Sequence, residues 1–167
     1  MTIENGRSNC WLLSTILLYC GVSLLFFSCT GTRPAVVGNG YGKLAVCPPT
    51  PNCVSTLAAD STHKIAPYPY EGSPKAAMRT LAKIIESRER TEIIAQTDLY
   101  LYAEFTSKIW RFVDDVEFYA DDSLKVIHFR SASRLGKSDM GVNRARMEHL
   151  RVQFRQEMGR EQNQQLQ

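Results

Sequence analysis

The sequence has no internal repeat, no long low-complexity segment and no strong excess of either charge. Its 167 residues carry a formal net charge of only +3, which is typical neither of a disordered chain nor of a nucleic-acid-binding domain. The histidines, His63, His128 and His149, lack the spacing of a metal site. A dinucleotide-binding fingerprint and a Walker loop are both missing. We therefore expect no metal, no cofactor and no nucleic-acid partner.

The N-terminal segment differs from the rest of the chain. Residues 11–27 are nearly all apolar and uncharged. This run is slightly shorter than a membrane span of about 20 residues and longer than a signal-peptide core of about 7–15 residues. Its end, Leu25-Phe26-Phe27-Ser28-Cys29, resembles a lipobox, in which the cysteine is lipidated and becomes the mature N-terminus. We expect residues 1–29 to be a signal peptide with lipidation at Cys29; the alternative is an uncleaved anchor helix, which exports the same domain.

This segment also predicts where the protein resides. A lipid on Cys29, or an anchor helix, would tether the chain to a membrane of the bacterial cell envelope, facing the periplasm or the exterior. Thr30 stands where an aspartate would signal retention in the inner membrane, which favours the outer membrane.

The predicted signal peptide also determines which cysteines remain in the mature domain. Cys10 and Cys20 would leave with the signal peptide, so that Cys47 and Cys53 remain as a pair in an exported domain. A disulfide is the expected state of such a pair. A metal site or a reactive thiol is the alternative, and only His63 lies near enough in the sequence to support the metal site.

The remainder of the chain divides into three parts. A glycine-rich linker is expected over residues 30–44, a single domain over 45–158 and a polar tail over 159–167. Ser73 and Pro74 predict the start of a helix, which continues with apolar residues at helical spacing to Ile85. A second helix is expected from about 138–139 to about 158.

Three strands are predicted between these helices, over 93–106, 109–119 and 124–131. Two-residue turns at 107–108 and 121–122 would join them. This register places Ala103 opposite Phe112 and makes one face of the sheet almost wholly apolar. The predicted fold is therefore α+β, an antiparallel sheet of at least three strands with two helices packed on one face.

Asp114 interrupts the apolar face of this sheet. A carboxylate buried there must be paired or hydrogen-bonded, and Arg134, Arg144, Arg146 or loop amides are the candidate partners. Such a pair would be a structural lock between a loop and the sheet, or else part of a catalytic or ligand-binding site.

The opposite face forms a second candidate cluster. The predicted register aligns Tyr100, Asp115 and His128 across three strands and places Tyr102 in the next row with Arg130. These groups could recognise a polar ligand or perform acid–base chemistry. A solvated face with cross-strand ion pairs is the alternative.

Residues 130–146 are rich in basic residues, serines and glycines and lie between a strand and the start of a helix. Loop amides, a helix N-terminus and arginines favour anions. The alternative is a capped turn whose arginines pair with Asp114, Asp115 and Glu117. Ser131 and Ser133 lack the context of a nucleophile elbow.

Four segments together resemble the DUF1499 family. They are Cys47-Pro to Pro51-Asn-Cys53-Val-Ser55, the run from Phe112 to Phe118, Arg130-Ser-Ala-Ser-Arg134, and the run from Ser138 to Arg146. The resemblance implies an exported or membrane-associated domain from about Cys47 to Phe154, without implying an activity. The polar positions within these segments would then form one shared site or one structural network.

Three hypotheses of function follow. The first is a non-catalytic envelope domain that binds a small anionic ligand, a lipid head group or a protein partner through the arginine-rich loop. Its candidate ligand-binding residues are Asp114, Asp115, Arg130, Ser131, Ser133, Arg134, Asp139, Asn143, Arg144 and Arg146. The second is a hydrolase or transferase with Asp114 or Asp115 as general base. The third is a purely structural lipoprotein.

Overall fold

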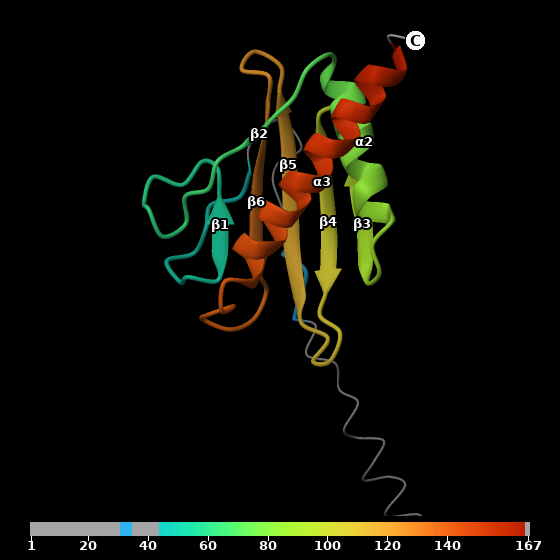
Figure 1. Cartoon of the computed structure of the whole chain (residues 1–167). Helices are drawn as coiled ribbons and strands as arrows, with labels where there is room; N and C mark the ends of the chain where they lie inside the picture. Colours follow the sequence, from blue (N-terminus) through green and yellow to red (C-terminus); the bar gives the residue numbers. More distant parts are fainter. Residues whose placement is uncertain (1–30, 35–43, 166–167) are drawn as a thin grey trace, which may run out of the picture.

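The structure is a computed structural model that describes residues 31–34 and 44–165. In this part of the chain, two helices pack on a six-stranded antiparallel sheet (Figure 1). The elements in chain order are β1 (Cys53–Ser55), β2 (Tyr68–Pro69), α2 (Pro74–Glu86), β3 (Thr91–Gln96), β4 (Tyr100–Thr106), β5 (Val113–Asp121), β6 (Val126–Ser133) and α3 (Val142–Gln165).

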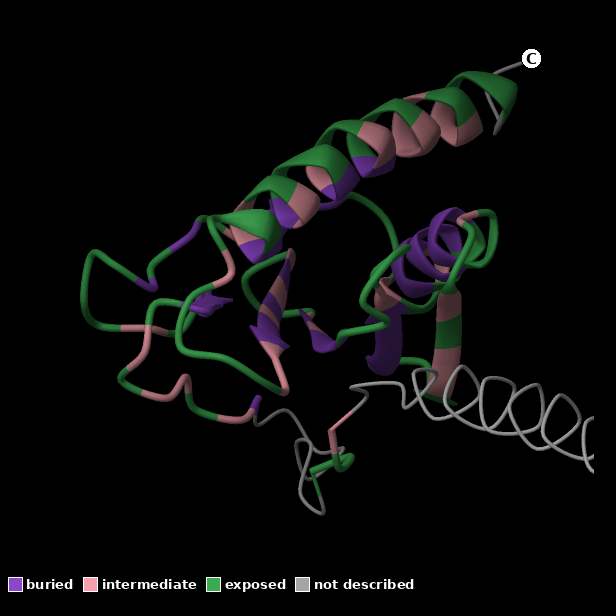
Figure 2. Ribbon diagram, turned by 90° about the horizontal axis from the view of Figure 1, so that it is seen from below, coloured by how far each residue is buried: buried purple, intermediate pink, exposed green. Residues whose placement is uncertain are grey.

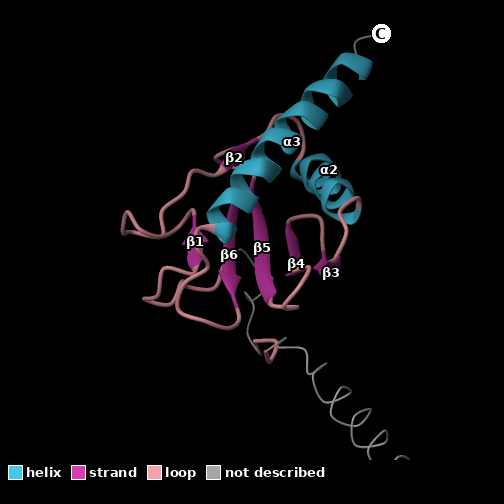
Figure 3. Cartoon of the chain, turned by 60° about the horizontal axis from the view of Figure 1, so that its bottom comes forward, coloured by secondary structure: helices cyan, strands magenta, loops and turns pink. Residues whose placement is uncertain are grey.

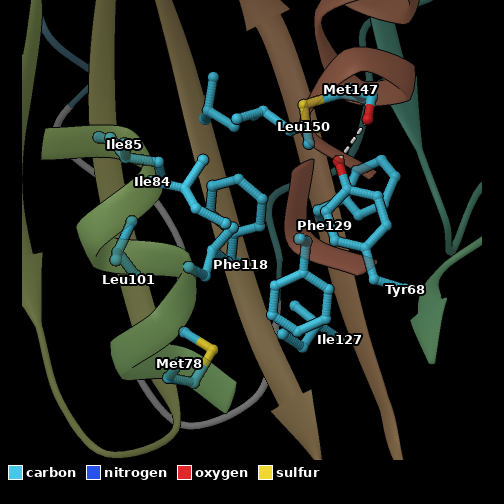
Figure 4. Packing of buried hydrophobic residues seen from close by; sticks show 14 of the residues in the cluster. Tyr68, Met78, Ile84, Ile85, Leu101, Phe118, Ile127, Phe129, Met147 and Leu150 are labelled. Carbon is cyan, nitrogen blue, oxygen red and sulfur yellow. Dashed lines mark hydrogen bonds between the residues drawn. The ribbon is translucent and has the colours of Figure 1, made fainter. Parts of the chain in front are cut away.

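The strands lie in the order β1-β6-β5-β4-β3, and β2 also pairs with β6. Both helices lie on the same side of the sheet (Figure 3). Between them and the sheet is one hydrophobic core, to which β5 and β6 contribute Phe118 and Phe129 (Figure 4). The Tyr68 hydroxyl donates to the Met147 carbonyl at 2.6 Å and fixes β2 to α3. The predicted α+β class, with two helices on one face, is confirmed.

The predicted start of the first helix is correct, and that of the second is not. Ser73 caps α2 by accepting a hydrogen bond from the Ala76 amide at 3.2 Å, with Pro74 in the first turn. In contrast, α3 begins at Val142, because Met140 and Gly141 both have positive φ and cannot continue a helix backwards to Ser138. α3 also continues beyond Met158 to Gln165.

The predicted register of the strands is wrong, but each side chain lies on the face of the sheet that was predicted for it. The predicted strand 93–106 is a hairpin of β3 and β4, and the connections between the later strands are longer than two residues. Ala103 therefore pairs with Val116 instead of Phe112, and Val116 pairs with Ser131 instead of Ile127. Each shift is four residues. Because side chains alternate between faces, an even shift leaves every side chain on its predicted face.

Hydrogen bonds within the connections explain the longer loops. The Ser107 amide donates to the Phe112 carbonyl at 2.8 Å, and the Phe112 amide donates to the Ser107 hydroxyl at 2.9 Å. These bonds close a loop over 107–112. At the next connection, the Asp121 carboxylate accepts from the amides of Ser123 and Leu124 and forms the turn itself.

The sheet has two distinct ends. Loops 107–112 and 134–141 lie at the same end, since the amide of Arg134 donates to the carbonyl of Val113 at 3.1 Å. Gly31 lies there too, because a Cβ on it would come 3.1 Å from the side chains of Arg134 and Leu135. We call this end, defined by residues 31–34, 107–112 and 134–141, the loop end. The turns 97–99 and 122–125 and the last turns of α3 lie at the opposite end (Figure 1).

The disulfide expected between Cys47 and Cys53 is present. The predicted signal peptide and the lipidation site Cys29 lie outside the described residues. In the part of the chain that the structure describes, no helix is long and apolar enough to cross a membrane.

Candidate functional site

Asp114 is held by Arg146 on the helix-covered face of the sheet. Arg146 reaches down from the first turns of α3 and pairs with the Asp114 carboxylate. Its other nitrogen donates to Asn143 Oδ1 at 2.8 Å and to Ser131 Oγ at 3.2 Å. The guanidinium also lies 4.9 Å from the centre of the Phe105 ring. Of the candidate partners of Asp114, the structure selects Arg146.

Asn143 joins three elements at the same place. Its amide nitrogen donates to the Asn52 carbonyl at 3.2 Å, the Ser133 hydroxyl at 3.0 Å and the Asp139 carboxylate at 2.8 Å. Its oxygen accepts from the Ser131 hydroxyl at 2.5 Å. Asn143 is fully buried, and its bonds connect the segment before β1, the end of β6 and the start of α3. The predicted site residues in these segments therefore meet as a structural junction.

Asp115, the next residue, is held from the other face of the sheet. Arg134 donates to it through Nε at 2.9 Å and through Nη2 at 2.6 Å, and the Tyr102 hydroxyl donates at 2.5 Å. Arg134 also pairs with Glu104, which Arg33 contacts in turn. Hydrogen bonding to Asp115 raises the pKa of Arg134. Only 2% of Asp115 is exposed, so this ion pair is closed to solvent.

A third buried pair lies beside it. Arg130 Nη1 is 3.6 Å from Glu117 Oε2, the Tyr100 hydroxyl donates to Glu117 Oε1 at 3.0 Å, and the Ala45 amide donates to Oε2 at 3.3 Å. Burial raises the pKa of Glu117 and lowers that of Arg130. Arg130 Nε is buried with no hydrogen-bond partner among the described residues.

The predicted row of Tyr100, Asp115 and His128 does not form. The shifted register pairs Tyr100 with Tyr119 and Tyr119 with His128, whereas Asp115 lies two rows further along, opposite Glu104. His128 Nδ1 lies 3.1 Å from Thr56 Oγ1, and burial lowers its pKa. Tyr102 and Arg130 do share a row, with Glu117 between them.

The pairing leaves few basic groups of the 130–146 loop free. Arg144 donates to the carbonyls of Lys64 and Thr62, each at 2.9 Å. Asp139 accepts a hydrogen bond from the Asn143 amide at 2.8 Å and caps α3. Burial disfavours the charged form of the Asp139 carboxyl, but hydrogen bonding outweighs burial, so the pKa of Asp139 is lowered. Within the described part of the chain, Lys137 makes no ion pair and is exposed. The alternative of a capped turn with internally paired arginines therefore describes this loop best.

Sequence reasoning missed several members of this network. Asn52 donates to the Gly136 carbonyl at 2.8 Å, and Glu104 and Arg33 complete the cluster around Arg134. Asn52 carried a usable signal, because it stands inside one of the four segments that resemble the family. Glu104 and Arg33 carried none, since their pairing depends on tertiary contacts.

A separate shallow groove of about 540 Å³ lies beside the disulfide loop, between residues 44–49 and 55–63. His63 forms part of its wall, with Nδ1 2.8 Å from Asp60 Oδ1 and Nε2 3.1 Å from the Thr50 carbonyl. The hydrogen bond to Asp60 raises the pKa of His63. In the described residues, no group of three or more His, Cys, Asp or Glu side chains could hold a metal ion.

Comparison with protein families gives one match, the family described as Protein of unknown function (DUF1499), over residues 43–154. This chain belongs to the DUF1499 family. The match to DUF1499 includes every strand, α2 and the buried part of α3, and it confirms the resemblance seen in the four segments. Within this DUF1499 domain, those segments supply Asn52, both aspartates and the arginines that hold them. No curated protein and no solved structure matches the chain.

Proposed function

We propose that this DUF1499 protein is a lipid-anchored, non-catalytic domain of the bacterial envelope that binds lipid head groups through the outer side of loop 134–141. One observation carries the proposal. Arg134, the arginine of this loop, points inward and is paired, whereas Leu135, Lys137 and Met140 point outward and are exposed. The loop is therefore fixed from inside and presents one cation between two apolar side chains.

A catalytic role for Asp114 or Asp115 has little support in this geometry. A general base needs an oxygen that can reach a substrate proton. Both carboxylates are buried and both are engaged by an arginine. The hydrolase or transferase hypothesis is therefore the weaker one.

A free anionic ligand is also a weaker candidate than a lipid surface. On the helix-free face, Arg33, Arg130 and Arg134 are opposed by Glu104, Asp115 and Glu117, so an anion would have to displace a buried carboxylate at considerable cost. Exposed apolar and cationic side chains side by side suit the boundary between head groups and acyl chains. Met140 is 98% exposed, which is unfavourable in water and favourable at such a boundary.

The lipid anchor is supported by the sequence at Cys29 and by the disulfide. The lipobox-like residues 25–29 end in a cysteine that directly precedes the linker 30–44. A disulfide between Cys47 and Cys53 is typical of exported proteins. On this proposal the protein faces the periplasm or the exterior, and Thr30 favours the outer membrane.

The proposal is tested on the full chain produced in bacteria and reconstituted into vesicles. Intact mass spectrometry should show a lipid that the Cys29→Ser variant lacks. Hydrogen exchange of the amides in 134–141 should slow when phosphatidylglycerol is added to phosphatidylcholine vesicles. Lys137→Glu should abolish this protection. Lys75→Glu, at the opposite end of the sheet, is the matched control and should retain it.

Three results would contradict the proposal. A wild-type chain that carries no lipid would rule out the lipid anchor at Cys29. Equal hydrogen exchange of residues 134–141 in both kinds of vesicle would rule out binding to anionic head groups. Protection that appears only when envelope proteins are added would instead indicate that the loop binds a protein partner.

A further inference from the structure

Loop 107–112 exposes two large apolar side chains at its tip. Ile109 is 78% exposed and Trp110 is 71% exposed, and they stand between the exposed cations Lys108 and Arg111. The core does not need these residues, since neither belongs to a buried cluster of the described chain. Exposed apolar residues that are adjacent and flanked by charge mark an interaction site more often than isolated ones do.

The loop presents these side chains in a defined conformation. The reciprocal hydrogen bonds between Ser107 and Phe112 close its base. Arg111 has a φ of 57°, in the left-handed region that non-glycine residues seldom occupy. A tip fixed in this way loses little conformational entropy when a surface binds it.

The position of the tip indicates what that surface is. Loop 107–112, which carries Ile109 and Trp110, lies at the same end of the sheet as loop 134–141, which carries Leu135 and Met140 (Figure 1). Gly31 contacts Leu135 there, and Gly31 is only two positions after Cys29. Because an extended chain spans at most about 3.6 Å per residue, a lipid on Cys29 would enter the bilayer within roughly 7 Å of this end.

Charge distinguishes the two ends of the sheet. Lys108, Arg111 and Lys137 are exposed at the loop end, and the nearby Glu89, which is also exposed, pairs with Arg90. The opposite end has turns that carry aspartates, at positions 98, 121 and 122, of which Asp98 pairs with Lys75 and Asp122 with Lys125. An anionic bilayer would therefore attract the loop end more strongly than the other.

We propose that Ile109 and Trp110 insert into the interface of an anionic bilayer and form a second membrane attachment beside the lipid of Cys29. The inference rests on the proposed anchoring at the same end and adds a separate set of residues to it. Tryptophan prefers the interface, where its ring is in an apolar layer and its N–H remains near polar groups. Stable membrane attachment commonly needs two such signals. The domain would then stand on the bilayer with its sheet upright and the C-terminus of α3 pointing away.

The sequence provides a direct probe. The chain has two tryptophans, Trp11 and Trp110, so in the full chain with Trp11→Phe all tryptophan fluorescence comes from position 110. In phosphatidylcholine–phosphatidylglycerol vesicles, the emission should shift to the blue. Lipids brominated near the head group should quench it, and iodide in the buffer should lose most of its quenching effect. Adding Ile109→Asp should reverse these changes.

The matched control moves the probe to the opposite end. Leu124, in the turn 122–125, is 65% exposed. In the chain with Trp11→Phe, Trp110→Phe and Leu124→Trp, emission should remain red-shifted and iodide should quench it fully. Iodide quenching of Trp110 in vesicles as strong as in detergent would overturn the inference. Equal bromolipid quenching at both ends would also overturn it, because the domain would then have no preferred orientation.

The outcomes separate this inference from the proposed function. If Cys29 carries no lipid and Trp110 is still quenched by bromolipids, the insertion stands and the lipid anchor fails. If the chain is lipidated and loop 134–141 is protected while Trp110 remains open to iodide, the proposed function stands and the insertion fails.

Discussion

Asp114 and Asp115 are adjacent in the sequence, yet their carboxylates lie on opposite faces of the sheet and are held by different arginines. Arg146 comes from α3 and holds Asp114, whereas Arg134 comes from the loop after β6 and holds Asp115. These two adjacent residues of β5 thus hold α3 to one face of the sheet and loop 134–141 to the other. Removing either arginine should leave a buried carboxylate without compensation.

The strongest such effect is expected for Arg134. Arg134→Met would leave Asp115 buried without an arginine and Glu104 with Arg33 alone, so the free energy of unfolding should fall by about 3–5 kcal/mol. Urea unfolding of the reconstituted or detergent-solubilised chain would measure it. Arg155→Met is the control, because Arg155 is exposed on α3 and should change stability by less than about 0.5 kcal/mol. Equal stability of the two variants would refute the structural role of Arg134.

The pair of Asp114 and Arg146 should show strong energetic coupling. In a double-mutant cycle of Asp114→Asn and Arg146→Gln, the second substitution should cost much less once the first is present. We expect a coupling energy of about 1–3 kcal/mol. Additive effects in urea unfolding would mean that the two side chains contribute independently, against the contact seen in the structure.

The disulfide should stabilise the domain by a modest amount. Cys47 and Cys53 enclose a short loop, so the chain-entropy gain is about 2 kcal/mol. Cys47→Ser with Cys53→Ser should therefore lower the free energy of unfolding by about that amount. A reducing agent should have the same effect on the wild type and none on the double variant. A wild type insensitive to reduction would show that the bond is absent in the folded protein.

The stability should depend on pH through His63. The hydrogen bond with Asp60 raises the pKa of His63 above its ordinary value of 6.5. A raised pKa in the folded state stabilises the fold below pH 6.5, and this contribution is lost as the pH rises through the folded value. NMR titration of the His63 ring should show the raised pKa. Asp60→Asn should return it toward 6.5 and remove the corresponding decline in stability; an unchanged titration would disprove the pairing.

The sequence was sufficient to predict the layers of the fold but not the register. Alternation of apolar and polar residues identifies which face a side chain occupies, and Asp114 and Asp115 were correctly placed on opposite faces. Alternation cannot detect a shift of the strand register by an even number of residues, because such a shift leaves every side chain on the same face. The true loop 107–112 is closed by Ser107, a bond that no periodicity reveals.

The candidate site, too, could be predicted only in part from the sequence. Its residues were predicted to lie together, and the alternative that the arginines pair with Asp114, Asp115 and Glu117 was recognised from their types. The assignment of Arg146 to Asp114 required the position of α3, which begins four residues later than Ser138 suggests. Hydrogen bonds that depend on such tertiary placement cannot be read from local pattern.

The pairing of β1 with β6 also determines when the sheet of this protein can be completed. β1 is the first strand and β6 the last, and Cys53 lies opposite Ala132. Figure 2, which views the sheet along its strands, shows buried residues on both of these strands. The edge of the sheet is incomplete until a ribosome has synthesised almost the whole domain, and pairing over so long a separation is slow. The hairpins β3–β4 and β4–β5 join neighbouring segments and can form earlier, so the closure of the β1 edge, and with it the contact of Asn143 with Asn52, is a late step in folding.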